Sequence, residues 1–108
     1  MTHPPKSLQP FLWSTAVNLL DLKRDKSYII HQLLLYGTFK ELRWLFTTYP
    51  KREIVDVFIH QPIRMYPRDM YVFVKNHLLS LFHVQLDEHK YVTSISGPVK
   101  PRAADRLT

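Results

Sequence analysis

The sequence predicts an all-α fold, a single small helical bundle that can take a helix-turn-helix-like form, followed by a flexible C-terminal arm. Three observations support this prediction. Apolar residues recur at helical spacing over residues 26–36 and again over 39–48. Thr38 and Glu41 match a capping box, the pair of side chains that satisfies free backbone N–H groups at a helix start. Two later prolines each precede a further run of apolar residues with helical spacing.

The chain has 108 residues, which is enough for one small domain. Residues 1–10 contain three of the eight prolines and are predicted to be an irregular lead-in. We expect the helical domain to span residues 11–83. Residues 84–108 are predicted to be an arm and a flexible basic tail.

The first two helices are predicted to meet at a short turn. Asp25 is a candidate N-cap for a helix over residues 26–36. Gly37 follows that helix, where a helix end favours a residue with positive φ. The second helix should then start at Thr38 and continue to about Thr48.

Prolines are expected to start the third and fourth helices. Pro50 and Pro67 suit a first helical turn, because the missing N–H of proline is not needed there. The third helix should end within residues 60–62. For residues 70–74 a strand is an open alternative, since the sequence YVFV has strong β-propensity. Residues 90–95 can form a short strand or part of an ordered arm.

Composition argues against an enzyme. The chain contains no cysteine, which excludes disulfides, thiolate metal sites and cysteine nucleophiles and fits a cytoplasmic location. It contains two glycines, so a glycine-rich phosphate loop is excluded. None of the six histidines forms an i, i+4 pair of the kind that binds zinc on a helix. We therefore expect no catalytic residue, no cofactor and no metal. The start of the chain lacks the pattern of a signal peptide, and no run reaches the ~20 apolar residues of a membrane span, so no membrane partner is expected.

Positive charge points to an acidic partner. The formal net charge is +6 and the isoelectric point is near 9.7, which favours nucleic acid or an acidic protein surface. The candidate nucleic-acid-binding residues are Lys51, Arg52, Arg64, Arg68 and Lys75. The first four lie at or near predicted helix starts, where cations and free N–H groups can meet phosphates, and Lys75 lies further along the fourth predicted helix. The alternative is that they are simply the solvated face of a helical bundle.

Aromatic residues are the candidates for contact with a protein partner. Trp44, Tyr49 and Tyr66 could form an exposed binding surface, or they could belong to the core. Trp44 lies in the sequence RWLF, and these four side chains cannot all point inward from one helix.

Residues 11 to 78 also carry a recognisable pattern. It consists of an apolar–Trp pair, an LDL turn, a helix ending in Tyr-Gly, and a WLF-x-TY segment: Leu12, Trp13, Leu20, Asp21, Ile29, Ile30, Tyr36, Gly37, Trp44, Leu45, Phe46, Thr48, Tyr49 and Ile54. In this pattern the chain resembles a family of small bacterial and archaeal proteins known only as a domain of unknown function. The chain departs from the pattern at Pro50, where the family has glycine, and at Phe73-Val74, where the family has an aromatic pair.

The resemblance implies a small all-helical domain with an antitoxin role. Members are often encoded beside nucleotidyltransferase-like toxins of the abortive-infection type. This chain lacks the Gly-Ser and paired-Asp signature of a nucleotidyltransferase, so it would be the partner and not the enzyme. We therefore expect a non-enzymatic antitoxin-like protein that binds a toxin, through aromatic residues and the C-terminal arm, and also operator DNA. The alternatives are a stand-alone nucleic-acid-binding regulator and a structural subunit of a larger complex.

Overall fold

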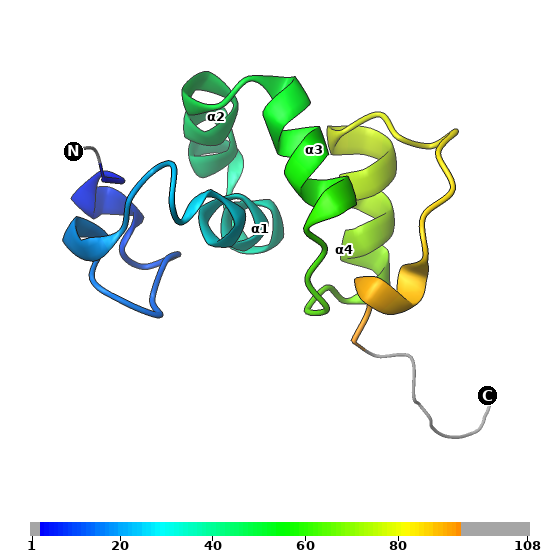
Figure 1. The fold of residues 1–108 in the computed structure, drawn as a ribbon, viewed down its shortest axis with the longest axis horizontal. Coiled ribbons are helices and arrows are strands. Elements are labelled where there is room, and N and C mark those ends of the chain that lie inside the picture. The colour runs from blue at the N-terminus through cyan, green and yellow to red at the C-terminus, as the bar shows by residue number, and fades with distance from the viewer. Residues whose placement is uncertain (1–2, 94–108) are drawn as a thin grey trace. The chain divides into compact units, whose positions relative to one another are not determined.

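The computed structural model describes residues 3–93, and their regular structure is helical. The four α-helices are α1 Lys26–Tyr36, α2 Phe39–Thr48, α3 Lys51–His60 and α4 Arg68–Phe73 (Figure 1). Shorter elements are three 3-10 turns, Lys6–Leu8, Val17–Leu19 and Glu88–Lys90, and a π-helical segment, Val74–Leu78, that continues α4. The predicted all-α class is confirmed. Within residues 3–93, no helix has both the length and the apolar composition to cross a membrane.

The chain divides into two compact units. The first is Met1–Gln61 and contains α1, α2 and α3, and the second is Pro62–Thr108 and contains α4. The boundary lies inside residues 11–83, which the sequence predicts as one helical domain.

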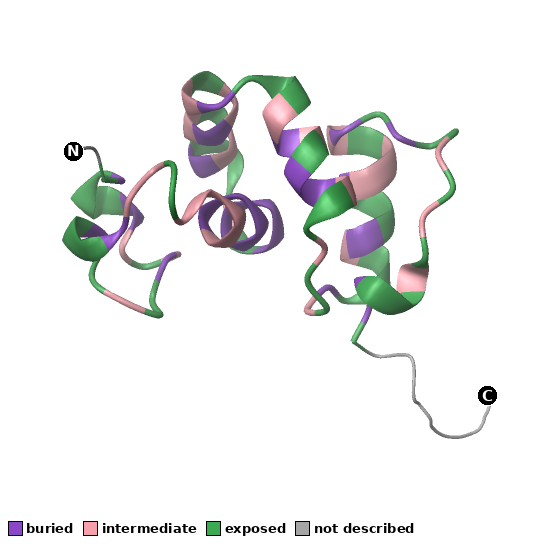
Figure 2. Cartoon of the chain, viewed as in Figure 1, coloured by how far each residue is buried: buried purple, intermediate pink, exposed green. Residues whose placement is uncertain are grey.

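Helix α1 is the central helix of the first unit. All seven residues from Ile29 to Leu35 are buried, so α1 presents buried side chains on every side (Figure 2). A helix that is apolar all round has to be covered all round. Both α2 and α3 contact it. Leu45 of α2 and Ile54 of α3 are fully buried and extend this core.

The turn between α1 and α2 confirms one prediction and corrects another. Gly37 has φ −68° and ψ 145°, so the predicted positive φ is wrong. Glycine is needed there for space, because a Cβ atom at this position would lie 2.6 Å from the carbonyl oxygen of Leu33. The capping box is confirmed: the N–H of Thr38 donates to Glu41 Oε1 at 2.8 Å, and the Thr38 hydroxyl donates to the same oxygen. The hydroxyl bond is the main reason that the pKa of Glu41 is lowered.

The other helix starts fall close to the predicted residues. Pro50 and Pro67 precede α3 and α4 directly, as N-cap residues and not within the first turn. Asp25 precedes α1, but its carboxylate does not cap that helix. It accepts hydrogen bonds from the N–H of Asp21 and the guanidinium of Arg24. The Arg24 bond is the main reason that the pKa of Asp25 is lowered.

The second unit settles the alternative at residues 70–74 in favour of a helix. Residues 68–78 are helical throughout, first as α4 and then as the π-helical segment. The helix ends before Ser80, which has φ 56°. The first part of the arm then returns to residue 66: the N–H of Tyr66 donates to the carbonyl of Tyr91 at 2.8 Å, and the N–H of Thr93 donates to the carbonyl of Tyr66 at 3.1 Å. This is one isolated parallel bridge, and residues 94–108 of the predicted tail lie outside the described residues.

One polar residue lies deep in the core of the first unit. His31 of α1 is 1% exposed, and its Nε2–H donates to the carbonyl oxygen of Gln61, after the end of α3, at 2.7 Å. The ring of Phe58 lies 6.1 Å away, measured between centroids. Burial lowers the pKa of His31 from its ordinary value of 6.5, although the bond to Gln61 acts in the opposite direction. His31 therefore favours the neutral form in the folded protein.

The stability of the protein should fall as the pH drops below about 6.5. Below that pH His31 binds a proton in the unfolded chain, whereas burial keeps it neutral in the folded chain. The free energy of unfolding therefore decreases by up to about 1.4 kcal/mol for each pH unit. Urea unfolding between pH 7.5 and 5.5 measures this slope. The His31→Gln variant should lose that part of the slope, and the variant His83→Gln, at an exposed position, should keep it. An equal slope in both variants would contradict the assignment.

Candidate functional site

Three of the predicted nucleic-acid-binding cations have partners within the second unit. The Arg64 Nε–H donates to the carbonyl of Val92 at 3.1 Å. Arg68 pairs with the Glu88 carboxylate at 3.5 Å, and Lys75 Nζ donates to the carbonyl of Leu81 at 2.8 Å. Arg64 and Arg68 thus connect the start of α4 to the arm. These interactions give the three side chains a structural role that is independent of any ligand.

The other two predicted cations lie at the start of α3 in the first unit. Lys51 and Arg52 are exposed, and within residues 3–93 neither forms an ion pair or a side-chain hydrogen bond. Lys40 and Arg43 are likewise exposed on α2. The first unit therefore holds four of the cations that are free to meet an acidic partner.

Two of the three predicted partner-binding aromatics are core residues, so the prediction of an exposed surface is wrong for them. Tyr49 is 5% exposed, and its hydroxyl donates to the carbonyl of Leu22 at 2.6 Å. Burial raises the pKa of Tyr49 to about 12. Tyr66 is fully buried, and burial raises its pKa still further. Trp44 is half-buried on α2.

A different set of aromatic side chains is exposed, and it lies where α1 meets α2. Trp13 is 55% exposed, Tyr36 44% and Phe39 79%. The rings of Trp13 and Tyr36 pack edge to face with centroids 4.8 Å apart. Tyr36 is the last residue of α1 and Phe39 is the first of α2, so the two rings flank the Gly37-Thr38 turn. We call Trp13, Tyr36 and Phe39 the corner surface.

Local geometry explains why these rings are not in the core. Phe39 comes six residues before the buried Leu45, and at about 100° per residue it points to a different side of α2. Arg43, one turn after Phe39, is exposed as well. The N–H of Ser14 donates to the Tyr28 hydroxyl at 3.1 Å, which fixes the chain next to Trp13 against α1. The corner surface is therefore held by the helix turn and by this bond.

Chemically, the corner surface combines exposed aromatic rings with positive charge. The carboxylate of Glu41, the acidic residue of α2, is buried and occupied in the capping box. The exposed charged residues of α2 are thus Lys40 and Arg43. Exposed apolar patches rimmed by polar residues mark interaction sites, and Trp and Tyr are frequent anchors of protein interfaces. Among residues 3–93, no three His, Asp or Glu side chains lie close enough together to hold a metal ion.

Residues 8–58 match a family of unknown function, DUF6922. The matched stretch contains the corner surface together with Lys51 and Arg52. It ends at residue 58, whereas the pattern described in the sequence analysis continues to residue 78. No curated protein and no solved structure matches the chain. The comparison thus places the corner surface, and none of the second unit, in the part of the chain that resembles a known family.

The sequence contained one signal for the corner surface. Trp13 and Tyr36 belong to the pattern of the resemblance, yet that pattern does not distinguish core from surface. Phe39 could not be distinguished from the core residues of α2 by spacing alone.

The Tyr49→Phe variant should be less stable than the wild type by about 0.5–1.5 kcal/mol, because the carbonyl of Leu22 loses its buried donor. Chemical denaturation followed by circular dichroism measures the difference. The matched control is Tyr36→Phe, since the Tyr36 ring is exposed, and it should change the free energy of unfolding by less than about 0.5 kcal/mol. Equal stability of the two variants would show that the hydrogen bond from Tyr49 to Leu22 does not stabilise the fold.

Proposed function

We propose that this chain is a non-enzymatic, antitoxin-like protein that binds a partner toxin through the corner surface. The observation that carries the proposal is the exposure of Trp13 and Tyr36, whose rings pack together, and of Phe39, which follows on the other side of the Gly37-Thr38 turn. Covering a large apolar side chain contributes about 1.5–3 kcal/mol, so three exposed rings are a substantial source of binding energy for a protein partner. Lys40 and Arg43 beside them favour an acidic rim on that partner.

The class of partner follows from the resemblance. Trp13 and Tyr36 are part of the pattern shared with small helical proteins that are encoded beside nucleotidyltransferase-like toxins of the abortive-infection type. A toxin of that class is therefore the proposed partner. The match of residues 8–58 to a family of unknown function supports a role that the first unit shares with that family. The experiment below tests what that role is.

Truncating two rings of the corner surface should strongly weaken toxin binding without unfolding the protein. In the Trp13→Ala/Phe39→Ala variant, affinity should fall by about 30-fold or more, because aromatic anchors at the centre of an interface typically contribute at least about 2 kcal/mol. The tagged protein is purified from its native host with and without nuclease, and retained proteins are identified by mass spectrometry. Titration calorimetry then gives the affinity of each variant for the retained toxin.

The matched control is Phe82→Ala, which removes an equally exposed ring from the second unit. It should retain the toxin at wild-type affinity. A nucleotidyltransferase that is retained after nuclease, and lost only in the corner-surface variant, supports the proposal. Partners that vanish with nuclease, or equal retention by all variants, would contradict it.

A second candidate function is binding of nucleic acid, as operator DNA in the antitoxin role or as the sole ligand of a stand-alone regulator. The observation that favours it is the pair of exposed cations Lys51 and Arg52 at the start of α3, which have no protein partner among the described residues. Cations at a helix start are well placed for phosphate, since the helix N-terminus itself attracts anions.

Replacing both of these cations should weaken DNA binding on every sequence. In the Lys51→Ala/Arg52→Ala variant the slope of log affinity against log salt should become shallower by about 2, because two phosphate contacts no longer release counterions. Fluorescence anisotropy between ~50 and ~200 mM salt measures this slope. The comparison variant is Arg64→Ala/Arg68→Ala, in which the replaced guanidinium groups already have protein partners, and it should lose less affinity. An unchanged slope in the first variant would remove Lys51 and Arg52 from the DNA interface.

A further inference from the structure

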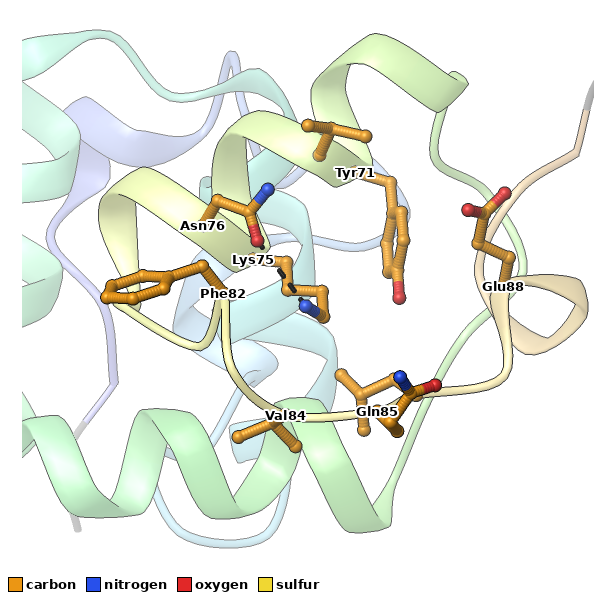
Figure 3. Close-up of a pocket in the computed structure, with 9 residues that line it drawn as sticks. Tyr71, Lys75, Asn76, Phe82, Val84, Gln85 and Glu88 are labelled. Atoms are coloured by element: carbon orange, nitrogen blue, oxygen red, sulfur yellow. Dashed lines mark hydrogen bonds between the residues drawn. The ribbon is translucent and has the colours of Figure 1, made fainter.

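The second unit contains a small pocket that no function described so far uses. It has a volume of about 240 Å³ and lies between α4, the π-helical segment and residues 82–88 (Figure 3). Pockets for drug-sized ligands usually have volumes of about 300–1,000 Å³, so this one suits a smaller molecule. Its walls carry two aromatic rings, two amides, one ammonium and one carboxylate: Tyr71, Phe82, Asn76, Gln85, Lys75 and Glu88.

The backbone holds the ammonium group at this pocket. The N–H of Leu81 donates to the carbonyl of Lys75 at 2.8 Å, and Lys75 Nζ donates back to the carbonyl of Leu81 at 2.8 Å. A longer contact of 3.4 Å joins Nζ to Asn76 Oδ1, as Figure 3 shows. An ammonium has three N–H donors, and these two acceptors leave one of them for a ligand.

The carboxylate comes from the other side of the same pocket. Glu88 is paired with Arg68 at 3.5 Å, a long contact between partly exposed groups. A carboxylate offers about four acceptor positions, so this pair leaves Glu88 able to accept from a ligand. Within residues 3–93, Lys75 and Glu88 do not pair with each other, although both line the pocket. Two opposite charges thus line the same pocket without pairing with each other.

Apolar surface completes the pocket. The ring of Tyr71 is fixed by the ring of Tyr91, with centroids 5.0 Å apart and an interplanar angle of 35°. Phe82 is 70% exposed and also lines the pocket, and in Figure 3 it lies on the far side of Lys75 from Tyr71. A small apolar group can pack against this lining.

We propose that this pocket binds a small zwitterion, of which a free amino acid is the simplest. Its carboxylate would accept from Lys75, its ammonium would donate to Glu88, and its side chain would pack against Phe82 and Tyr71. A mononucleotide or a phosphate ion fits less well, because the Glu88 carboxylate would repel the phosphate. The pocket lies in the second unit, and the corner surface lies in the first, so this inference does not depend on the toxin proposal.

The first test uses the full chain and three probes that share the phenylalanine side chain and differ in the charges that they carry. L-phenylalanine carries both charges, N-acetyl-L-phenylalanine lacks the ammonium, and L-phenylalaninamide lacks the carboxylate. In NMR titrations the free amino acid should bind at millimolar concentration or better, and each derivative should bind at least 10-fold more weakly. No binding of the free amino acid, or equal binding of all three probes, would overturn the proposal, as would preferential binding of adenosine monophosphate.

The second test uses variants of the pocket. Glu88→Gln and Lys75→Gln should each lower affinity for L-phenylalanine by at least 10-fold, and the matched control Lys90→Gln, at an exposed lysine that does not line the pocket, should leave it unchanged. Because Lys75→Gln also removes the bond to Leu81, thermal unfolding checks its fold. If Lys75→Gln fails to fold, Phe82→Ala still tests the proposal. The Phe82 ring is exposed, so its removal should leave the protein folded and should still lower the affinity for L-phenylalanine. Wild-type affinity in Glu88→Gln and Phe82→Ala would overturn the assignment.

Discussion

The burial of α1 is the constraint on which the first unit depends. Five aliphatic side chains of this helix, Ile29, Ile30, Leu33, Leu34 and Leu35, are at most 8% exposed. Each such side chain contributes about 1.5–3 kcal/mol when it is fully buried, so this run is a large part of the hydrophobic stabilisation of the first unit. A helix that is buried on every side needs neighbours on every side. The sharp turn at Gly37, which allows α2 to return against α1 at once, follows from that need.

The same constraint accounts for the polar residues in and around the core. His31 has almost no access to water, so it donates a hydrogen bond to the carbonyl of Gln61, the residue after α3, and it resists protonation. Tyr49 likewise donates its hydroxyl to the backbone at Leu22. The His31 bond joins residues 30 positions apart and the Tyr49 bond joins residues 27 positions apart. Both bonds supply partners for polar groups that packing removes from water. Side chains left over from this packing, above all Trp13 and Phe39, form the corner surface.

The second unit is held by a different means. Within residues 62–93 it has one short α-helix and its π-helical continuation, and hydrogen bonds join the flanking segments to each other and to that continuation. Arg64 reaches the carbonyl of Val92, Lys75 reaches that of Leu81, and residue 66 pairs with the arm. Arg64 and Lys75 thus hold segments of the unit together through backbone carbonyls. Lys75 also places a positive charge at the pocket. In the proposed amino-acid site, the structural and binding roles would coincide in the side chain of Lys75.

By itself the sequence determined the all-α class, the approximate bounds of α1, α2 and α3 and the capping box, because periodicity, prolines and the Thr38–Glu41 pair act over a few residues. It did not determine which aromatic residues face solvent. Helical spacing gives the faces of a helix, and only the tertiary packing decides that Tyr49 is covered and Phe39 is not. It also could not show that Arg64 is engaged by Val92 or that Lys75 and Glu88 line one pocket. Those contacts join residues 13 to 28 positions apart, and no local pattern encodes them.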